Sequence, residues 1–419
     1  MKQMITAFFK GMKPLEVSEY IILCLTAIVL PFSWVWSVWM LYFLVANSIL
    51  LAVSGRKLGN PGLSKGARWS LWLLVMFYMY QVVSLIYTSN MKDAGNMLLH
   101  RLPLLIFPLC CLMCDTGFMT RLRQRTLVWL FTGSLVVKFI IRLVYVLCTS
   151  HRIVLSSSFD PVHHSYIAMY LLFVLGFLYS EWFYHRQELK TWMLWMLGII
   201  AAVSATYLVM VLSRAGIAGL VLIVVMIIIH LFFRLKERKL GLIVLAFALA
   251  IGAGVFFMLP ESARRLTQTF EEMSEGDTSD ARFLIYGSSM KAIRQSLPFG
   301  VGIGDRNDVL LQVYEETGEE YAIKAQYNSH NIYLDAMLTM GIPGILLLLA
   351  VFIVPAVYAY KERDFIMLSL IFAVAFSGLF EAVLHRQMGV VFMGLFWFVL
   401  LAGGDNEKHL NPVLSPKEQ

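Results

Sequence analysis

The chain has 419 residues, of which 59% are hydrophobic and only 15% are charged, and its mean hydropathy is +0.72. Soluble globular domains carry about 25% charged residues, so this composition excludes a soluble enzyme and predicts an all-α, polytopic membrane protein embedded in a lipid bilayer. The formal net charge of +7 is compatible with nucleic-acid binding. Basic cytoplasmic loops explain it more simply, so no nucleic-acid partner is expected.

Apolar runs separated by charged breaks predict about twelve membrane spans, since each span needs about twenty apolar residues. We expect one integral membrane domain over residues 1–419 without a cleavable signal peptide, and a large polar loop at 260–329 between the ninth and tenth spans. The predicted spans lie near residues 19–32, 34–53, 70–87, 102–114, 127–147, 165–183, 192–212, 216–233, 240–259, 342–360, 364–383 and 388–403.

Basic residues concentrate in alternate connections between these spans. The positive-inside rule places such connections in the cytoplasm. Both termini are then cytoplasmic, and the loop at 260–329 faces outward. The basic connections contain Arg56, Lys57, Lys65 and Arg68; Arg121, Arg123 and Arg125; Arg186 and Lys190; Arg234, Lys236, Arg238 and Lys239; and Lys361 and Arg363.

The outward loop is predicted to be partly helical. Helices are expected over residues 261–273 and 281–296, the second with Asp280 as its N-cap. A turn at 298–304 and a short helix from Asn307 to near Gly318 follow. Ser329 is then expected to cap a helix that carries His330 in its first turn. The stretch 341–344, Gly-Ile-Pro-Gly, should break the path before the last spans, because proline is disfavoured inside helices.

Four cations lie where an anion can bind at the outer membrane boundary. Lys138 and Arg142 are four residues apart and share one face of the fifth span. Charges inside a span are costly unless they are paired, snorkelling or functional. Arg214 lies in a tight outward turn, and Arg282 lies in the first turn of a loop helix. Snorkelling also accounts for Arg142, and simple solvation for Arg214 and Arg282.

His330 is the candidate general base, because imidazole can take up a proton near neutral pH. A histidine at a helix start is, without further context, more often a cap or a solvated residue. His164, Tyr166 and Glu381 add polar groups at the same depth, with Glu381 near the outward end of the eleventh span. A carboxylate at that position is expected to have a partner such as an arginine or a hydroxyl.

Nucleotide and metal chemistry have no support in the sequence. Gly300-Val-Gly-Ile-Gly304 has the wrong spacing and context for a dinucleotide fingerprint, and no Walker motif or HExxH is present. Cys110, Cys111 and Cys114 lack a nearby histidine or carboxylate, so we interpret them as packing residues. Neither a cofactor nor a metal ion is expected.

Several short motifs follow one another in a specific order across residues 160–400. They are Ser213-Arg214-Ala-Gly-Ile, Arg282 with Tyr286, the glycine turn at 298–304, Ser329-His330-Asn331-Ile-Tyr-Leu334, Gly341-Ile-Pro-Gly344 and Glu381. In this order the chain resembles the O-antigen ligase and O-antigen polymerase superfamily of bacterial inner-membrane glycosyltransferases. Many members carry an acid just before the glycine that Gly341 matches. Met340 stands there in this chain, so the group that orients His330 is left open.

The resemblance implies an enzyme that takes a polyprenyl-diphosphate-linked glycan as donor on the periplasmic side of the inner membrane. A ligase passes this glycan to a lipid A-core sugar hydroxyl, whereas a polymerase passes it to a second lipid-linked glycan. With this chemistry, we expect inverting transfer with three catalytic residues and six substrate-binding residues. The catalytic residues are His330 as base with Arg214 and Arg282, and the substrate-binding residues are Lys138, Arg142, His164, Tyr166, Asn331 and Glu381.

Two other classes of protein remain as alternatives. A small-solute transporter should show inverted repeats and broken helices that meet at mid-membrane, and the sequence shows neither. A structural membrane scaffold would leave the cations inside the spans unexplained.

Overall fold

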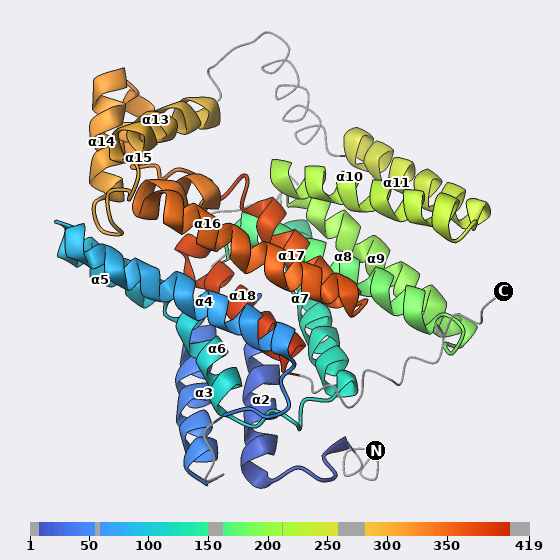
Figure 1. Cartoon of the computed structure of the whole chain (residues 1–419). Coiled ribbons are helices and arrows are strands. Elements are labelled where there is room, and N and C mark those ends of the chain that lie inside the picture. The colour runs from blue at the N-terminus through green and yellow to red at the C-terminus, as the bar shows by residue number, and fades with distance from the viewer. Residues whose placement is uncertain (1–7, 55–58, 150–161, 212, 259–280, 403–419) are drawn as a thin grey trace.

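The structure is a computed structural model of the chain, and it describes residues 8–54, 59–149, 162–211, 213–258 and 281–402 (Figure 1). Within these ranges every regular element is a helix, so the protein is an all-α, polytopic membrane protein as predicted. The elements are α2 (Pro14–Val29), α3 (Trp34–Ser54), α4 (Lys65–Val83), η1 (Ser84–Tyr87), α5 (Met91–Arg101), α6 (Pro103–Met113), α7 (Arg121–Thr149), α8 (His164–His185), α9 (Thr191–Met210), α10 (Arg214–Ile229), η2 (His230–Arg234), α11 (Arg238–Met258), α13 (Ala281–Ser296), α14 (Arg306–Thr317), α15 (Glu320–Ala325), α16 (Ile332–Lys361), α17 (Phe365–Ser377), η3 (Val383–His385) and α18 (Gln387–Leu401).

Each predicted span coincides with a helix, but the helices differ in length. In the described ranges seven helices are long and apolar enough to cross a membrane alone, or eight if the bent pair α5–α6 forms one span. The helices α2, α17 and α18 have 16, 13 and 15 residues. A straight span needs at least about 17 residues, so these three helices are too short to cross the membrane alone. The apolar composition therefore predicted more full-length spans than the helices form.

The core of the bundle is centred on α8 and α18. All residues of α18 from Met388 to Leu401 are buried, as expected for a helix that is apolar on every side. The ring of Phe131 in α7 lies 4.9 Å from that of Phe396 in α18, and Phe173 in α8 lies 4.7 Å from the same ring. These contacts join three helices into one aromatic core.

The described parts of the predicted basic connections meet at one end of the bundle, which we call the basic end. Arg121 at the start of α7 pairs with Asp364 at 2.7 Å, and Arg125 pairs with Glu181 near the end of α8 at 2.6 Å. The helices α8 and α16 both end here and begin at the opposite end, which we call the His330 end. The alternation of basic and less basic connections in the sequence therefore corresponds to two ends of the folded chain.

The helix α16 is broken at Gly341, as the sequence predicts. Gly341 has φ +64° and ψ −152°, which interrupts the helical hydrogen bonds. The carbonyls of Leu338 and Thr339 accept instead from two backbone amides of the glycine turn 298–304, both at 2.9 Å. A side chain on Gly341 would place its Cβ 2.0 Å from the carbonyl oxygen of Pro298, so only glycine fits this junction.

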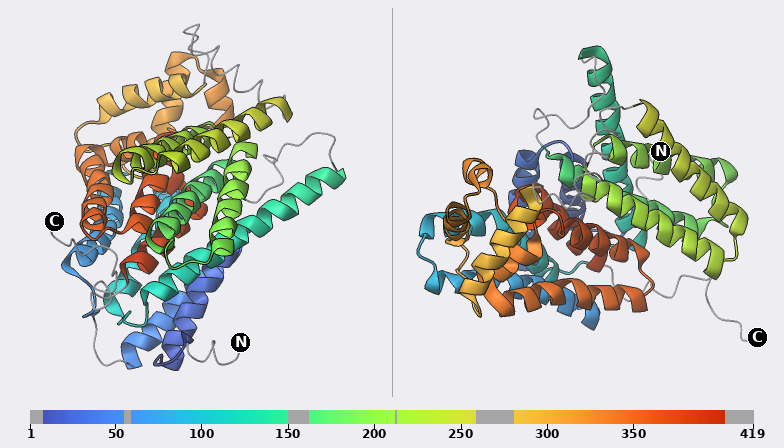
Figure 2. Two further views of the ribbon diagram at one scale, coloured as in Figure 1. Left: turned by 90° about the vertical axis from the view of Figure 1, so that its right-hand side faces the viewer. Right: turned by 90° about the horizontal axis from the view of Figure 1, so that it is seen from above.

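The loop helices lie together beyond the membrane helices (Figures 1 and 2). The predictions for α13 and α14 are confirmed, and Gly318 ends α14 in the left-handed conformation with φ +73°. The short helix α15 was not predicted. The predicted helix at 261–273 and the predicted cap Asp280 lie outside the described residues.

Candidate active site

His330 lies just before α16 and not inside its first turn. The helix begins at Ile332 with Asn331 as its N-cap, whose Oδ1 accepts from the amides of the second and third helical residues at 2.8 and 3.1 Å. The prediction that Ser329 caps a helix containing His330 was therefore wrong. Serine and asparagine are about equally good caps, so local preference does not distinguish them.

The backbone of His330 is in the left-handed region, with φ +45°. Few residues other than glycine adopt this conformation, although histidine does so more often than most. The amide of His330 donates to Oδ1 of Asn328 at 2.8 Å, and its ring lies edge-on to Tyr327 with centroids 5.2 Å apart. These contacts hold the imidazole at a defined place outside the helix.

Glu381 is the direct partner of this imidazole. Its Oε1 lies 3.2 Å from Nδ1 of His330, and its Oε2 accepts from the Ser165 hydroxyl at 3.4 Å. The residue lies in the connection between α17 and α18 and not within a span. A carboxylate on Nδ1 selects the tautomer in which Nε2 is free to accept a proton. Glu381 is thus in position to orient His330, the role that Met340 leaves open.

The charge of Glu381 is set by its surroundings. Burial by itself would raise its pKa, but the hydrogen bond and charge of His330, with the charges of His163 and Arg282, lower the pKa below the ordinary value of 4.5. The carboxylate is therefore ionised at neutral pH. It can stabilise positive charge on an imidazole that has taken up a proton.

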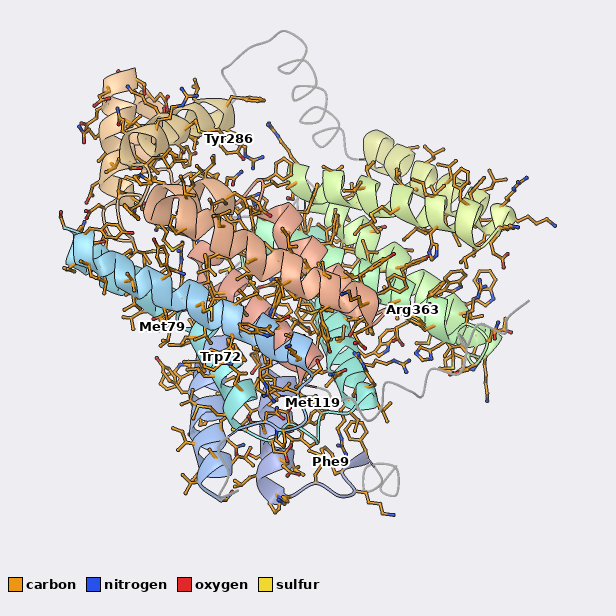
Figure 3. All side chains as sticks on the ribbon, in the orientation of Figure 1. Phe9, Trp72, Met79, Met119, Tyr286 and Arg363 are labelled. Atoms are coloured by element: carbon orange, nitrogen blue, oxygen red, sulfur yellow. The ribbon has the colours of Figure 1, made fainter. Side chains whose placement is uncertain are left out.

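The loop helix α13 is attached to the same place. The Tyr286 hydroxyl donates to the carbonyl of Leu379 at 3.0 Å, and Nδ2 of Asn331 donates to that carbonyl at 2.9 Å. Tyr286 lies on the side of α13 that faces the membrane helices (Figure 3). Arg282 is one turn before Tyr286 on α13, half-buried, and close enough for its charge to act on Glu381.

The start of α8 completes this side of the site. The rings of His163 and His164 lie 3.9 Å apart, and Tyr166 is buried, with 2% of its surface exposed. Ser165, between His164 and Tyr166, is the residue that contacts Glu381. The structure therefore brings the predicted residues His164 and Tyr166 to the neighbourhood of the His330–Glu381 pair.

Arg214 is the first residue of α10, and its side chain is exposed. Ser213 caps this helix by accepting from the amide of Gly216 at 3.2 Å. A Cβ added to Gly216 would lie 2.7 Å from the Cβ of Ala168, so the first turn of α10 packs closely against the first turns of α8. Arg214 accordingly lies at the His330 end.

Lys138 and Arg142 lie on α7, whose C-terminal part extends beyond its neighbours (Figure 2). Lys138 is buried, and its ammonium donates to the carbonyl of Pro31 at 2.6 Å. The guanidinium of Arg142 lies 5.7 Å from the Tyr145 ring. These two contacts are with the α2–α3 connection and with α7 itself, and so they do not place either cation at the His330–Glu381 pair.

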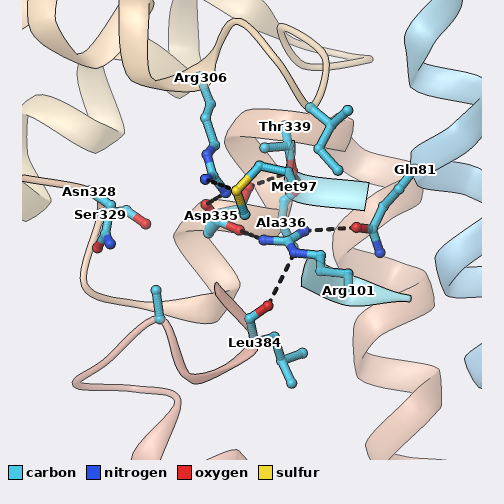
Figure 4. Close-up of polar contacts among 12 residues, drawn as sticks. Gln81, Met97, Arg101, Arg306, Asn328, Ser329, Asp335, Ala336, Thr339 and Leu384 are labelled. Carbon is cyan, nitrogen blue, oxygen red and sulfur yellow. Dashed lines mark hydrogen bonds and ion pairs between the residues drawn. The ribbon is translucent and has the colours of Figure 1, made fainter. Parts of the chain in front are cut away.

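A second polar cluster at this end was not predicted (Figure 4). Asp335 binds Arg101 through Oδ2 at 2.6 Å and Arg306 through Oδ1 at 3.0 Å. All three residues are buried. The sequence did contain a signal for this cluster, because Arg101 and Asp335 lie next to apolar stretches and buried charges need partners. Their pairing could not be predicted, because it joins distant parts of the sequence.

Part of the chain matches a known protein family. Residues 199–349 match the family described as O-Antigen ligase. The matched segment contains Arg214, Arg282, His330 and the break in α16, whereas Glu381 lies beyond it. No curated protein matches the chain. Over residues 199–349 the chain is therefore similar to the O-antigen ligase family.

Proposed function

We propose that this multi-pass bacterial membrane protein transfers a glycan from a polyprenyl diphosphate carrier to a sugar hydroxyl of the lipid A-core. The contact between Nδ1 of His330 and Glu381 at 3.2 Å carries this proposal, together with the family match. An imidazole oriented by a carboxylate is the arrangement that general-base catalysis on a hydroxyl needs.

In the proposed reaction, Nε2 of His330 accepts the proton of the acceptor hydroxyl while the hydroxyl oxygen attacks the anomeric carbon. The bond from that carbon to the diphosphate oxygen breaks, and the configuration at the carbon is inverted. Polyprenyl diphosphate leaves with the bonding electrons. Arg214 and Arg282 bind the diphosphate and stabilise its developing charge, often the largest catalytic contribution.

The predicted substrate-binding residues are supported by different observations. His164 and Tyr166 flank Ser165, which contacts Glu381, so we place them at the substrate. Asn331 joins α16 to the segment with Glu381 and lies beside the base. For Lys138 and Arg142, binding of the donor remains a prediction from the sequence. We further propose that catalysis requires neither metal nor cofactor.

We propose that both termini are in the cytoplasm of an inner-membrane protein, with one membrane domain over residues 1–419. The loop 260–329 is then periplasmic, between the ninth and tenth predicted spans. The clustering of basic connections at the end opposite His330 supports this orientation. Cysteines introduced one at a time at Lys361 and Lys324, in a variant without the five native cysteines, test it with an impermeant reagent. Only the second should react in intact cells with a permeabilised outer membrane.

Complementation of a deletion strain tests the reaction. The wild-type gene should restore long-chain glycolipid, whereas His330→Ala should not and should leave polyprenyl-linked glycan to accumulate. A strain whose core carries one glycan repeat without the long chains would instead indicate a polymerase, which shares the donor chemistry. An unchanged glycolipid pattern in the deletion strain would contradict both activities.

A further inference from the structure

The segment that carries Glu381 is attached to other elements on both sides of that residue. Before Glu381, the carbonyl of Gly378 accepts from the amide of Ile332 at 2.9 Å, and Leu379 accepts from Asn331. After Glu381, the carbonyl of Leu384 accepts from Nε of Arg101 at 3.2 Å. The place of the Glu381 carboxylate is therefore set between two attachments.

Arg101 makes the second attachment, the one to Leu384. Its Nη2 donates to Asp335 at 2.6 Å and its Nη1 donates to Oε1 of Gln81 at 2.9 Å, while Nε holds Leu384 (Figure 4). One planar guanidinium thus joins α4, α16 and the segment with Glu381. Lysine has the same charge but no planar fork, so it cannot reproduce three directed bonds.

Asp335 lies on α16, the helix that His330 precedes, and both its oxygens are bound. Arg306 from α14 holds the second oxygen at 3.0 Å and also donates to the sulfur of Met97 at 3.0 Å. Burial lowers the pKa of Arg306 to about 10 although the Asp335 carboxylate opposes this shift, so Arg306 remains charged at neutral pH. Removing one member of such a buried group leaves an uncompensated charge, which loosens the whole arrangement.

We infer that Arg101 and Asp335 are positioning residues for the proposed transfer: they hold the Glu381 carboxylate against His330 by fixing Leu384 to α16. They act through Glu381, because Arg101 is only 2% exposed and Asp335 only 5%. The inference rests on the proposed function and adds a group, distant in sequence, that determines the geometry of its base.

Arg101→Lys and Asp335→Asn test this inference in the full-length protein in proteoliposomes. The donor is polyprenyl-diphosphate-linked glycan, the acceptor is lipid A-core, and rates are normalised to folded protein. We expect kcat to fall about 10- to 100-fold with a nearly unchanged KM for the donor, because small displacements of a catalytic group have effects of this size. Arg306→Lys should reduce kcat less, since Arg306 holds Asp335 but not Leu384.

A double-mutant cycle with Glu381→Gln separates positioning from general stability. If Arg101 acts through the Glu381 carboxylate, Arg101→Lys should lower transfer much less in the Glu381→Gln protein than in the wild type. Glu181→Gln is the matched control: it removes a carboxylate bound to Arg125 at 2.6 Å at the basic end and should leave kcat unchanged.

Three results would overturn the inference. The first is a wild-type kcat in both Arg101→Lys and Asp335→Asn. The second is that the fold-loss of kcat in Arg101→Lys is the same in the Glu381→Gln protein as in the wild type. The third is failure of both variants to fold, which would assign the cluster to stability alone. The proposed function fails separately: it is contradicted if His330→Ala still transfers glycan. If His330→Ala and Glu381→Gln are inactive but Arg101→Lys is normal, only the positioning inference fails.

Discussion

Two carboxylates near the start of α16 bind basic side chains, Asp335 two arginines and Glu381 one histidine, but their surroundings differ. Asp335 is enclosed: its side chain is 7% exposed, and those of Arg101 and Arg306 are 2% and 1% exposed. Glu381 is more open, with a side chain that is 15% exposed beside a His330 side chain that is 23% exposed. Only His330 and Glu381, which we call the open pair, are partly exposed.

The difference in basic partner matters as much as the difference in exposure. Both arginines keep their protons at neutral pH, so the cluster around Asp335 holds a constant charge there. The imidazole of His330 instead offers Nε2 as a proton acceptor, which no arginine side chain can do. The ion cluster around Asp335 and the proposed reactive pair thus lie close together, and they should respond differently to substitution.

The largest effect is expected when the imidazole of the open pair is removed. His330→Ala should reduce transfer about 10²- to 10⁴-fold, the usual contribution of a general base. The measurement is the rate of glycan transfer in proteoliposomes. His185→Ala is the matched control, because His185 also contacts a carboxylate, Glu188, at 3.3 Å but at the basic end. Equal rates for His330→Ala and wild type would remove the open pair from catalysis.

Arg282→Ala should reduce transfer about 10- to 100-fold, since charge-assisted hydrogen bonds contribute about 1.5–3 kcal/mol. Arg282→Lys should recover only part of this loss, because lysine cannot bind a diphosphate with two parallel bonds. The effect should appear in KM for the donor as well as in kcat. A full recovery by lysine would show that charge alone matters at this position.

Glu381→Gln keeps the shape of the side chain and removes its charge. We expect about a tenfold loss of kcat, because the imidazole loses both its orienting acceptor and the charge that stabilises its protonated form. Glu188→Gln, in the exposed pair with His185, should have no effect. If Glu381→Gln transfers at the wild-type rate, the open pair does not need its carboxylate.

Gly341→Ala tests the junction that attaches the glycine turn to α16. The substitution combines a positive φ with a Cβ 2.0 Å from Pro298, so it should destabilise the protein by about 1–3 kcal/mol. Thermal unfolding in detergent measures this change. Gly198→Ala is the control, because a Cβ there meets nothing within 4 Å and alanine favours the helix. An unchanged melting temperature for Gly341→Ala would contradict the break in α16.

The smallest effect concerns the acid stability of the open pair. The pKa of Glu381 is lowered on folding, so its stabilisation is present above its ordinary value of 4.5 and is lost as pH falls below it. The difference in melting temperature between wild type and Glu381→Gln should therefore shrink as pH falls from 7 to 3.5. A difference that grows over this range would contradict an ionised Glu381.

Local signals in the sequence predicted much of the fold. Apolar runs marked the helices, Gly318 marked the end of α14, and the glycine and proline at 341–344 marked the break in α16. His330 stood out as a titratable residue at the end of a polar loop. Each of these features depends on a few neighbouring residues, so a single sequence contains the information.

The partners of these residues were not predictable in the same way. Glu381 is 51 residues from His330, and Arg101 is 234 residues from Asp335. The packing of the helices decides which charged residues come into contact, and a local sequence pattern does not contain this information. The predicted cap of α16 was wrong for a different reason. Ser329 and Asn331 are both good caps, and the hydrogen bond from Asn331 to Leu379 favours Asn331.

The bond from Lys138 to Pro31 has a consequence for the biogenesis of the protein. An unpaired lysine within an inserting helix is costly, so α7 enters the bilayer more easily if a carbonyl is already present to accept from its ammonium. The α2–α3 hairpin is synthesised before α7 and supplies that acceptor through the Pro31 carbonyl. The part of the chain that is made first thus carries the acceptor for a charge on a helix that is made later.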